Sequence, residues 1–70
     1  MRYREAAAKL TALGCTELPR RGHGSHRTWY NPATERLATL PDWGGKDIRL
    51  GTLRAVVRQL GLEWQRFLDS

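Results

Sequence analysis

The 70-residue chain contains twelve basic and seven acidic residues, which give it a formal net charge of +5 and a pI near 10.4. Its apolar fraction of 40% argues against a disordered tail, and its length excludes a second domain, so we expect one domain over residues 1–70. A basic excess on so small a body makes a polyanion the leading partner, with a solvated basic surface as the alternative.

The cysteine content and the lengths of the apolar runs exclude several further classes of protein. Cys15 is the only cysteine, which excludes an internal disulfide and a zinc site built from several cysteines. No apolar run approaches the roughly 20 residues of a membrane span, and the first residues lack the apolar run of a signal peptide. We therefore expect a cytoplasmic protein that does not enter a membrane.

The first predicted element is a helix. Tyr3, Ala6, Ala7, Leu10 and Leu13 recur at steps of three and four residues, so they form one apolar stripe. Gly14 then supplies a stop, because glycine accepts the left-handed conformation that commonly ends a helix.

Short extended segments follow. Residues 15–21 contain Pro19, which cannot donate to a sheet ladder, so this stretch is at best an edge strand. Residues 20–25 form a basic turn, residues 25–30 a strand, residues 31–35 a turn, and residues 36–40 a third strand that completes a hairpin. Alternation puts His26 on one face of the middle strand and Arg27 and Trp29 on the other, with Trp29 in the core.

The second half of the chain is helical. After a loop at residues 41–46, in which we expect Trp43 to be exposed, Leu53, Val56, Val57 and Leu60 mark one face of a helix that ends at Gly61. Residues 62–68 predict a short tail helix, with Trp64, Phe67 and Leu68 packing inward.

This order, α-β-β-β-α plus a short C-terminal helix, predicts an α+β fold with two helices on one face of a three-stranded antiparallel sheet. It resembles the architecture of the double-stranded-RNA-binding domain.

His26 is the leading candidate for chemistry. An imidazole has an unperturbed pKa of about 6.5, so beside a phosphate it can take a proton from a 2′-hydroxyl of RNA or return one to the leaving oxygen. Nearby groups that can hold the phosphate are Arg20, Arg21, Arg27 and Lys46, with Gly24 and Ser25 offering a close backbone and a hydroxyl. The alternative is a surface histidine in a basic turn.

A metal site is the less favoured use of the histidines. His23 and His26 lie three residues apart, but no third ligand is near in sequence, and Asp42 or Asp47 would have to be recruited by folding. We expect no metal and no small-molecule cofactor. His23 itself remains open as a second proton-transfer group or a turn residue.

Three segments in order carry a family resemblance. Residues 24–27 (GSHR) resemble the G-S-H motif of HicA toxins, residues 41–47 (PDWGGKD) resemble that family's loop of proline, polar or aromatic residue, glycine and lysine, and residues 51–54 (GTLR) and 60–62 (LGL) are similar to its closing helix. The segment before the motif is longer and more basic than the usual family form.

The resemblance implies a function. HicA toxins are endoribonucleases that cleave mRNA without a required metal, have a fold like the double-stranded-RNA-binding domain, and are neutralised by a HicB antitoxin. It implies that His26 is the catalytic histidine. Two alternatives remain: a non-catalytic RNA-binding module with the same fold, and a protein-interaction domain whose basic face meets an acidic partner.

Overall fold

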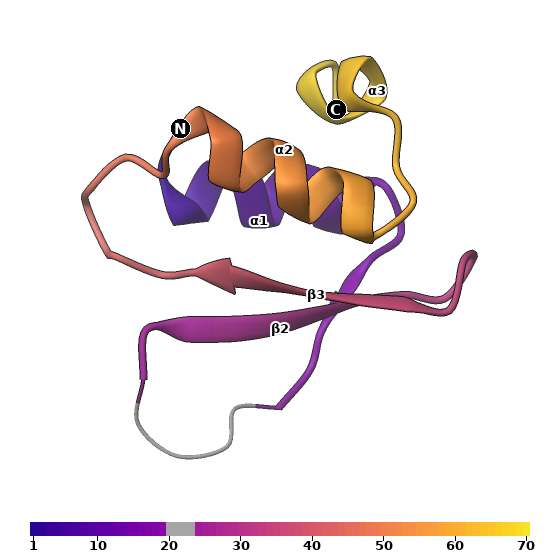
Figure 1. Cartoon of the computed structure of the whole chain (residues 1–70), viewed down its shortest axis with the longest axis horizontal. Helices are drawn as coiled ribbons and strands as arrows, with labels where there is room; N and C mark the ends of the chain where they lie inside the picture. The colour runs from indigo at the N-terminus through magenta and orange to yellow at the C-terminus, as the bar shows by residue number, and fades with distance from the viewer. Residues whose placement is uncertain (20–23) are drawn as a thin grey trace.

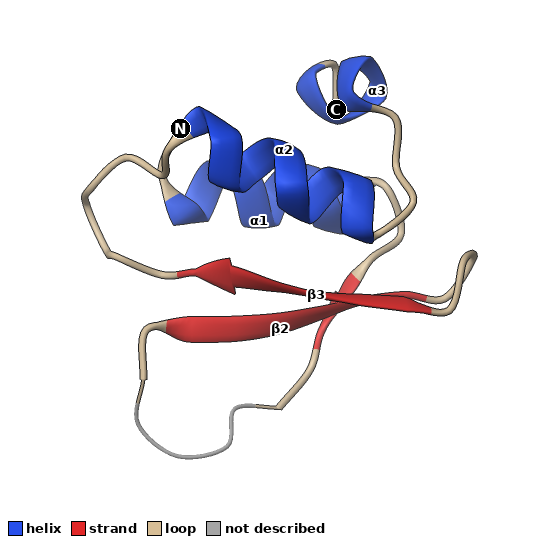
Figure 2. Ribbon diagram, viewed as in Figure 1, coloured by secondary structure: helices blue, strands red, loops and turns tan. Residues whose placement is uncertain are grey.

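The helices and strands follow the predicted order. The computed structural model describes residues 1–19 and 24–70, so Arg20, Arg21 and His23 lie outside the described residues. Its elements are α1 (Tyr3–Ala12), β1 (Thr16–Glu17), β2 (His26–Asn31), β3 (Arg36–Pro41), α2 (Leu50–Gln59) and α3 (Trp64–Leu68). Helices α1 and α2 form one layer and the sheet forms the other (Figures 1 and 2), which confirms the α+β class and the double-stranded-RNA-binding-domain-like layout.

The sheet is antiparallel, with strand order β1-β2-β3. Strand β1 has only two residues and lies at one edge, as its proline-containing segment predicts. The hairpin of β2 and β3 pairs His26 with Pro41 at one end and Asn31 with Arg36 at the other. Both strands extend one residue beyond their predicted ends.

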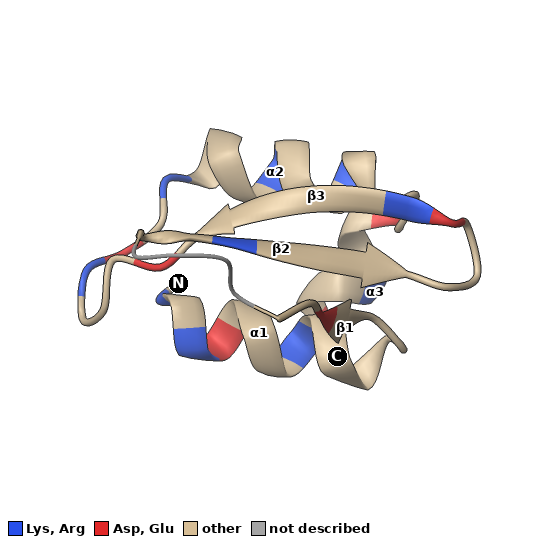
Figure 3. Cartoon of the chain, turned by 90° about the horizontal axis from the view of Figure 1, so that it is seen from below, with Lys and Arg blue, Asp and Glu red and all other residues tan. Residues whose placement is uncertain are grey.

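The two faces of β2 differ sharply in burial. Trp29 is 3% exposed and lies between the sheet and the helices, whereas His26 and Thr28 are exposed on the opposite, open face. Figure 3 looks onto that open face, with α1 and α2 behind the strands. The predicted alternation along this strand is confirmed.

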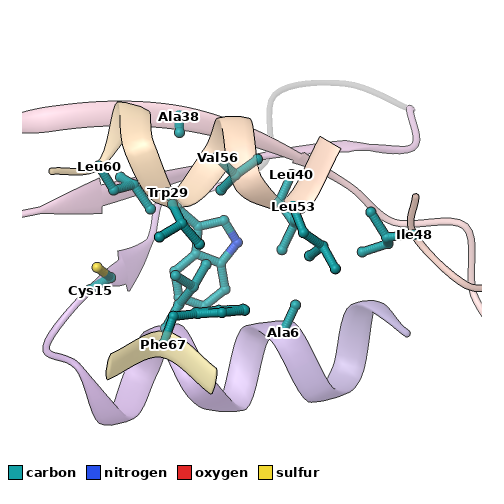
Figure 4. Packing of buried hydrophobic residues seen from close by; sticks show 12 residues of the cluster. Ala6, Cys15, Trp29, Ala38, Leu40, Ile48, Leu53, Val56, Leu60 and Phe67 are labelled. Atoms are coloured by element: carbon teal, nitrogen blue, oxygen red, sulfur yellow. The ribbon is translucent and has the colours of Figure 1, made fainter. Parts of the chain in front are cut away.

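The hydrophobic core lies between the sheet and the helix layer. Figure 4 shows the Trp29 indole at its centre, close to Phe67 of α3. The apolar stripes of both long helices point into the same core, and the Cys15 side chain lies at the edge of this core near β1. Burial raises the pKa of the Cys15 thiol. The described residues include no helix long and apolar enough to cross a membrane.

Helix α3 packs with only part of the face that its sequence predicts. Phe67 is 1% exposed and stacks on Trp64 with ring centroids 5.5 Å apart. Leu68, which we expected to pack inward, is 38% exposed, so that prediction is wrong. The reason is geometric, because neighbouring helical residues point about 100° apart and a five-residue helix buries only a narrow stripe.

Candidate functional site

His26 begins β2 on the uncovered side of the sheet. Its side chain is exposed, and across the hairpin it faces Pro41, the last residue of β3. The other side chains on this face are small or polar near His26 and become larger toward the far end, where Tyr30 pairs with the exposed Leu37. His26 is therefore accessible to a large ligand such as a nucleic acid strand.

An open hollow of about 790 Å³ lies at the same end of the sheet. It is lined by the residue before β2, the loop after β3 and the first turn of α2 with its N-cap, namely Ser25, Asp42, Trp43, Lys46, Arg49 and Thr52. His26 does not line it. Within the described part of the chain, neither Lys46 nor Arg49 makes an ion pair, so both charges are available to an anion.

Backbone hydrogen bonds bring the hollow's segments together. The Asp42 N–H donates to the Ser25 carbonyl, which continues the β2–β3 ladder one pair beyond Pro41. The Asp42 carboxylate then accepts from the Gly44 N–H at 3.1 Å, and Gly44 takes the left-handed conformation at φ 64° that the turn requires. Trp43 is 40% exposed at this turn, as predicted.

Arg27 lies on the covered face of the sheet, opposite His26. One of its terminal nitrogens is 3.1 Å from Glu17 of β1, the other is 3.0 Å from Asp42, and its guanidinium lies 5.4 Å from the centre of the Tyr3 ring. Arg27 thus joins α1, β1, β2 and the loop after β3. Its charge is already paired with two carboxylates inside the fold.

A small hydrogen-bonded network supports this arginine. The Tyr3 hydroxyl donates to Glu17 and accepts from the Trp29 indole N–H at 3.3 Å. Burial, together with the hydrogen bond to Glu17, raises the pKa of Tyr3 to about 12. The hydrogen bond from Arg27 to Glu17 raises the pKa of the guanidinium, which therefore stays charged.

The structure brings some of the predicted site residues together and separates others. Ser25 and Lys46 share the hollow, and Gly24 is exposed one residue before Ser25. His26 lies at the same end of the sheet but on its other face, and the predictions for Arg20 and Arg21 fall outside the described residues.

Arg49 and Thr52 were not predicted as site residues. Arg49 lies immediately before α2 and Thr52 in its first turn, close in sequence to the loop that holds Lys46. The sequence signal was this proximity to the glycine-rich loop, since the start of a helix after such a loop often carries anion-binding groups.

Residues 1–19 and 24–70 contain no group of three or more His, Cys, Asp or Glu side chains that could hold a metal ion.

Comparison with known proteins identifies one family. A family model described as "HicA toxin of bacterial toxin-antitoxin" matches residues 3–62, which is most of the chain. The matched range includes β2, the hollow and the whole of α2, and it ends before α3. No curated protein and no solved structure matches the chain.

Proposed function

Because the chain belongs to the family of HicA toxins of bacterial toxin–antitoxin systems, we propose that it is an endoribonuclease that cleaves mRNA with His26 as its catalytic residue. A HicB-type antitoxin holds it inactive in the cytoplasm. The observation that carries the proposal is the exposure of His26 on the open face, at the end of the sheet where Lys46 and Arg49 line the hollow.

The chemistry needs no metal. His26 accepts the proton of a 2′-hydroxyl, whose oxygen attacks the adjacent phosphorus while the bond to the leaving oxygen breaks. The leaving oxygen then takes a proton, either from the imidazolium or from a second donor. Positive charge near the phosphate stabilises the additional negative charge of the transition state.

The hollow supplies the proposed RNA contacts. Lys46 and Arg49 pair with backbone phosphates, and the Ser25 hydroxyl donates a hydrogen bond to one of them. The exposed Trp43 indole stacks on an unpaired base. An RNA strand that crosses the end of the sheet reaches the hollow and His26 together. Arg20, Arg21 and Gly24 extend this contact in our proposal.

The decisive test compares RNA cleavage by the parent, His26→Ala and Thr28→Ala, all in chelator. Thr28 is a matched control because it is exposed on the same face, two residues along β2. We expect His26→Ala to lose about 10²-fold or more in cleavage rate, and Thr28→Ala to keep the parental rate. A deoxynucleotide at the cut site should block cleavage by the parent.

Two results would contradict the proposal. Equal cleavage by the parent and His26→Ala removes His26 from the mechanism. No cleavage by a folded parent, together with salt-sensitive RNA binding that persists in His26→Ala, identifies a non-catalytic RNA-binding module instead.

A further inference from the structure

Strand β3 is the long free edge of the sheet. The strand order β1-β2-β3 gives it a partner strand on one side only, and within the described residues no strand pairs with its other side. The opposite edge is formed by β1, which has two residues against six in β3. Figure 3 shows β3 running along the border of the sheet with α2 behind it.

The direction of the β3 backbone groups follows from one hydrogen bond. The Asp42 N–H donates to the Ser25 carbonyl, so the backbone groups of Asp42 face β2. In an antiparallel strand the N–H and C=O of a residue point to the same side, and the side alternates with each residue. The groups of Leu37, Thr39 and Pro41 therefore face away from β2.

A second hydrogen bond fits the same alternation on β2. The Leu18 N–H donates to the Thr28 carbonyl at 2.9 Å, which turns Thr28 toward β1. Thr28 pairs with Thr39, and the two residues direct their backbone groups away from each other, as a non-hydrogen-bonded antiparallel pair requires. Thr39 thus presents its N–H and C=O to the outside of the sheet.

The outer edge offers both hydrogen-bonding groups and apolar contact. Pro41 lacks an N–H, but Leu37 and Thr39 keep theirs, and an exposed row of this kind accepts an added strand. Leu37 is 55% exposed, and its side chain lies with that of Thr39 on the open face. The strand begins with Arg36 and contains no acidic residue.

We propose that β3 binds an extended, acidic segment of the antitoxin by strand addition. The backbone groups of Leu37 and Thr39 pair with the added strand, and an apolar side chain of that strand covers Leu37. The net charge of +5 favours an acidic occupant and opposes pairing of two copies of this chain through the same edge. The identity of the partner rests on the toxin assignment, whereas the strand-adding edge does not.

Strand addition at this edge also explains how binding would silence the toxin. Alternate side chains of the added strand project onto the open face, beside Leu37 and Thr39. His26 is on β2 opposite Pro41, so it lies two strand spacings, about 10 Å, across the same face and two residues, about 7 Å, along it from the position beside Thr39. Long side chains or the body of the antitoxin cover His26 from there.

The test removes one outward N–H. Thr39→Pro deletes the donor while leaving the inward pairing of β3 with β2 intact, as Pro41 already does in the parent, and Thr39→Val is the control that keeps the N–H. Each variant is titrated with the purified HicB-type antitoxin that pairs with this toxin in our proposal. We expect Thr39→Pro to bind at least about tenfold more weakly and Thr39→Val to bind like the parent. Parental affinity of folded Thr39→Pro would overturn the proposal.

Amide hydrogen exchange on the parent gives a second readout that needs no variant. The amides of Leu37 and Thr39 should become protected when the antitoxin binds. Unchanged exchange in the complex would overturn the proposal even if Thr39→Pro fails to fold. Protection in the isolated parent, together with the mass of a dimer, would assign the edge to a second copy and overturn the antitoxin as occupant. Neither readout depends on ribonuclease activity, so the proposed function can fail separately.

Discussion

At the scale of single residues, neighbours in sequence have opposite roles. His26 is exposed on the open face, while Arg27 is held on the covered face by ion pairs with Glu17 and Asp42. Their opposite faces follow from strand alternation and were predictable. The two carboxylate partners of Arg27 were not, because they come from segments ten residues before it and fifteen residues after it, which only the fold brings together.

Deprotonation of the Tyr3 hydroxyl at alkaline pH should weaken this network and destabilise the fold. The folded pKa of Tyr3, about 12, is above the ordinary value of 10.0, so its contribution is fully present below pH 10 and is lost as the pH rises toward 12. We expect denaturant unfolding of the parent to lose stability over this range more steeply than that of Tyr3→Phe, which has no phenol proton to lose. Parallel stability curves for the two proteins would contradict this assignment.

At the scale of elements, the hairpin turn holds the end of α2. The Leu60 carbonyl accepts hydrogen bonds from the Asn31 amide at 2.8 Å and from the Thr34 hydroxyl at 2.9 Å. Gly61 follows in the left-handed conformation at φ 73° and reverses the chain toward α3. The glycine stop was predictable from the sequence, whereas the contact of the turn with this helix end depends on how the two elements pack.

Gly61→Ala should therefore destabilise the fold. An added Cβ would lie 2.8 Å from the Thr34 methyl carbon and would occupy a left-handed backbone, at a cost of about 1–3 kcal/mol. Gly51→Ala is the matched control, because Gly51 lies inside α2 with open space around it and should gain about 0.5–1 kcal/mol. Thermal and urea unfolding of both variants measure the difference. Equal stability would contradict the strain at Gly61.

At the scale of the whole molecule, α3 completes the core from outside the range that the family model matches. The match ends at residue 62, yet Phe67 is among the most deeply buried side chains. The Lys9 ammonium of α1 donates to the Leu68 carbonyl at 2.7 Å and anchors the end of this helix. Periodicity predicted α3 itself, but a five-residue helix has too few positions to distinguish Phe67 from Leu68.

Alanine substitutions at two adjacent positions of α3 measure the contribution of this helix to the free energy of unfolding. Phe67→Ala should lose about 3–5 kcal/mol of unfolding free energy, since it empties a site between the sheet and the helices. Leu68→Ala should change the stability by less than about 1 kcal/mol, because that side chain is 38% exposed. Denaturant titration of both variants gives the comparison. A loss of similar size at both positions would show that α3 packs differently.

The site was predictable in part at this same scale. The order of the motifs pointed to Ser25 and Lys46, which the fold does bring into one hollow. Arg49 and Thr52 follow the glycine-rich loop closely, but which side chains after that loop line the hollow depends on the angle at which the loop enters α2. The charge of Arg27 predicts a contact with RNA, and in the fold this side chain pairs with Glu17 and Asp42 on the face opposite His26.

The alternation along β2 also divides its positions into two groups that respond differently to substitution. The side chains of His26 and Thr28 are exposed and that of Tyr30 is half-buried, so we expect substitutions at these three positions to leave the packing of the core unchanged. Substitutions at 27, 29 and 31 remove an ion pair, a central indole and a buried amide, so we expect them to destabilise the fold. A strand with this pattern can change its exposed side chains without any change to the side chains that hold the core together.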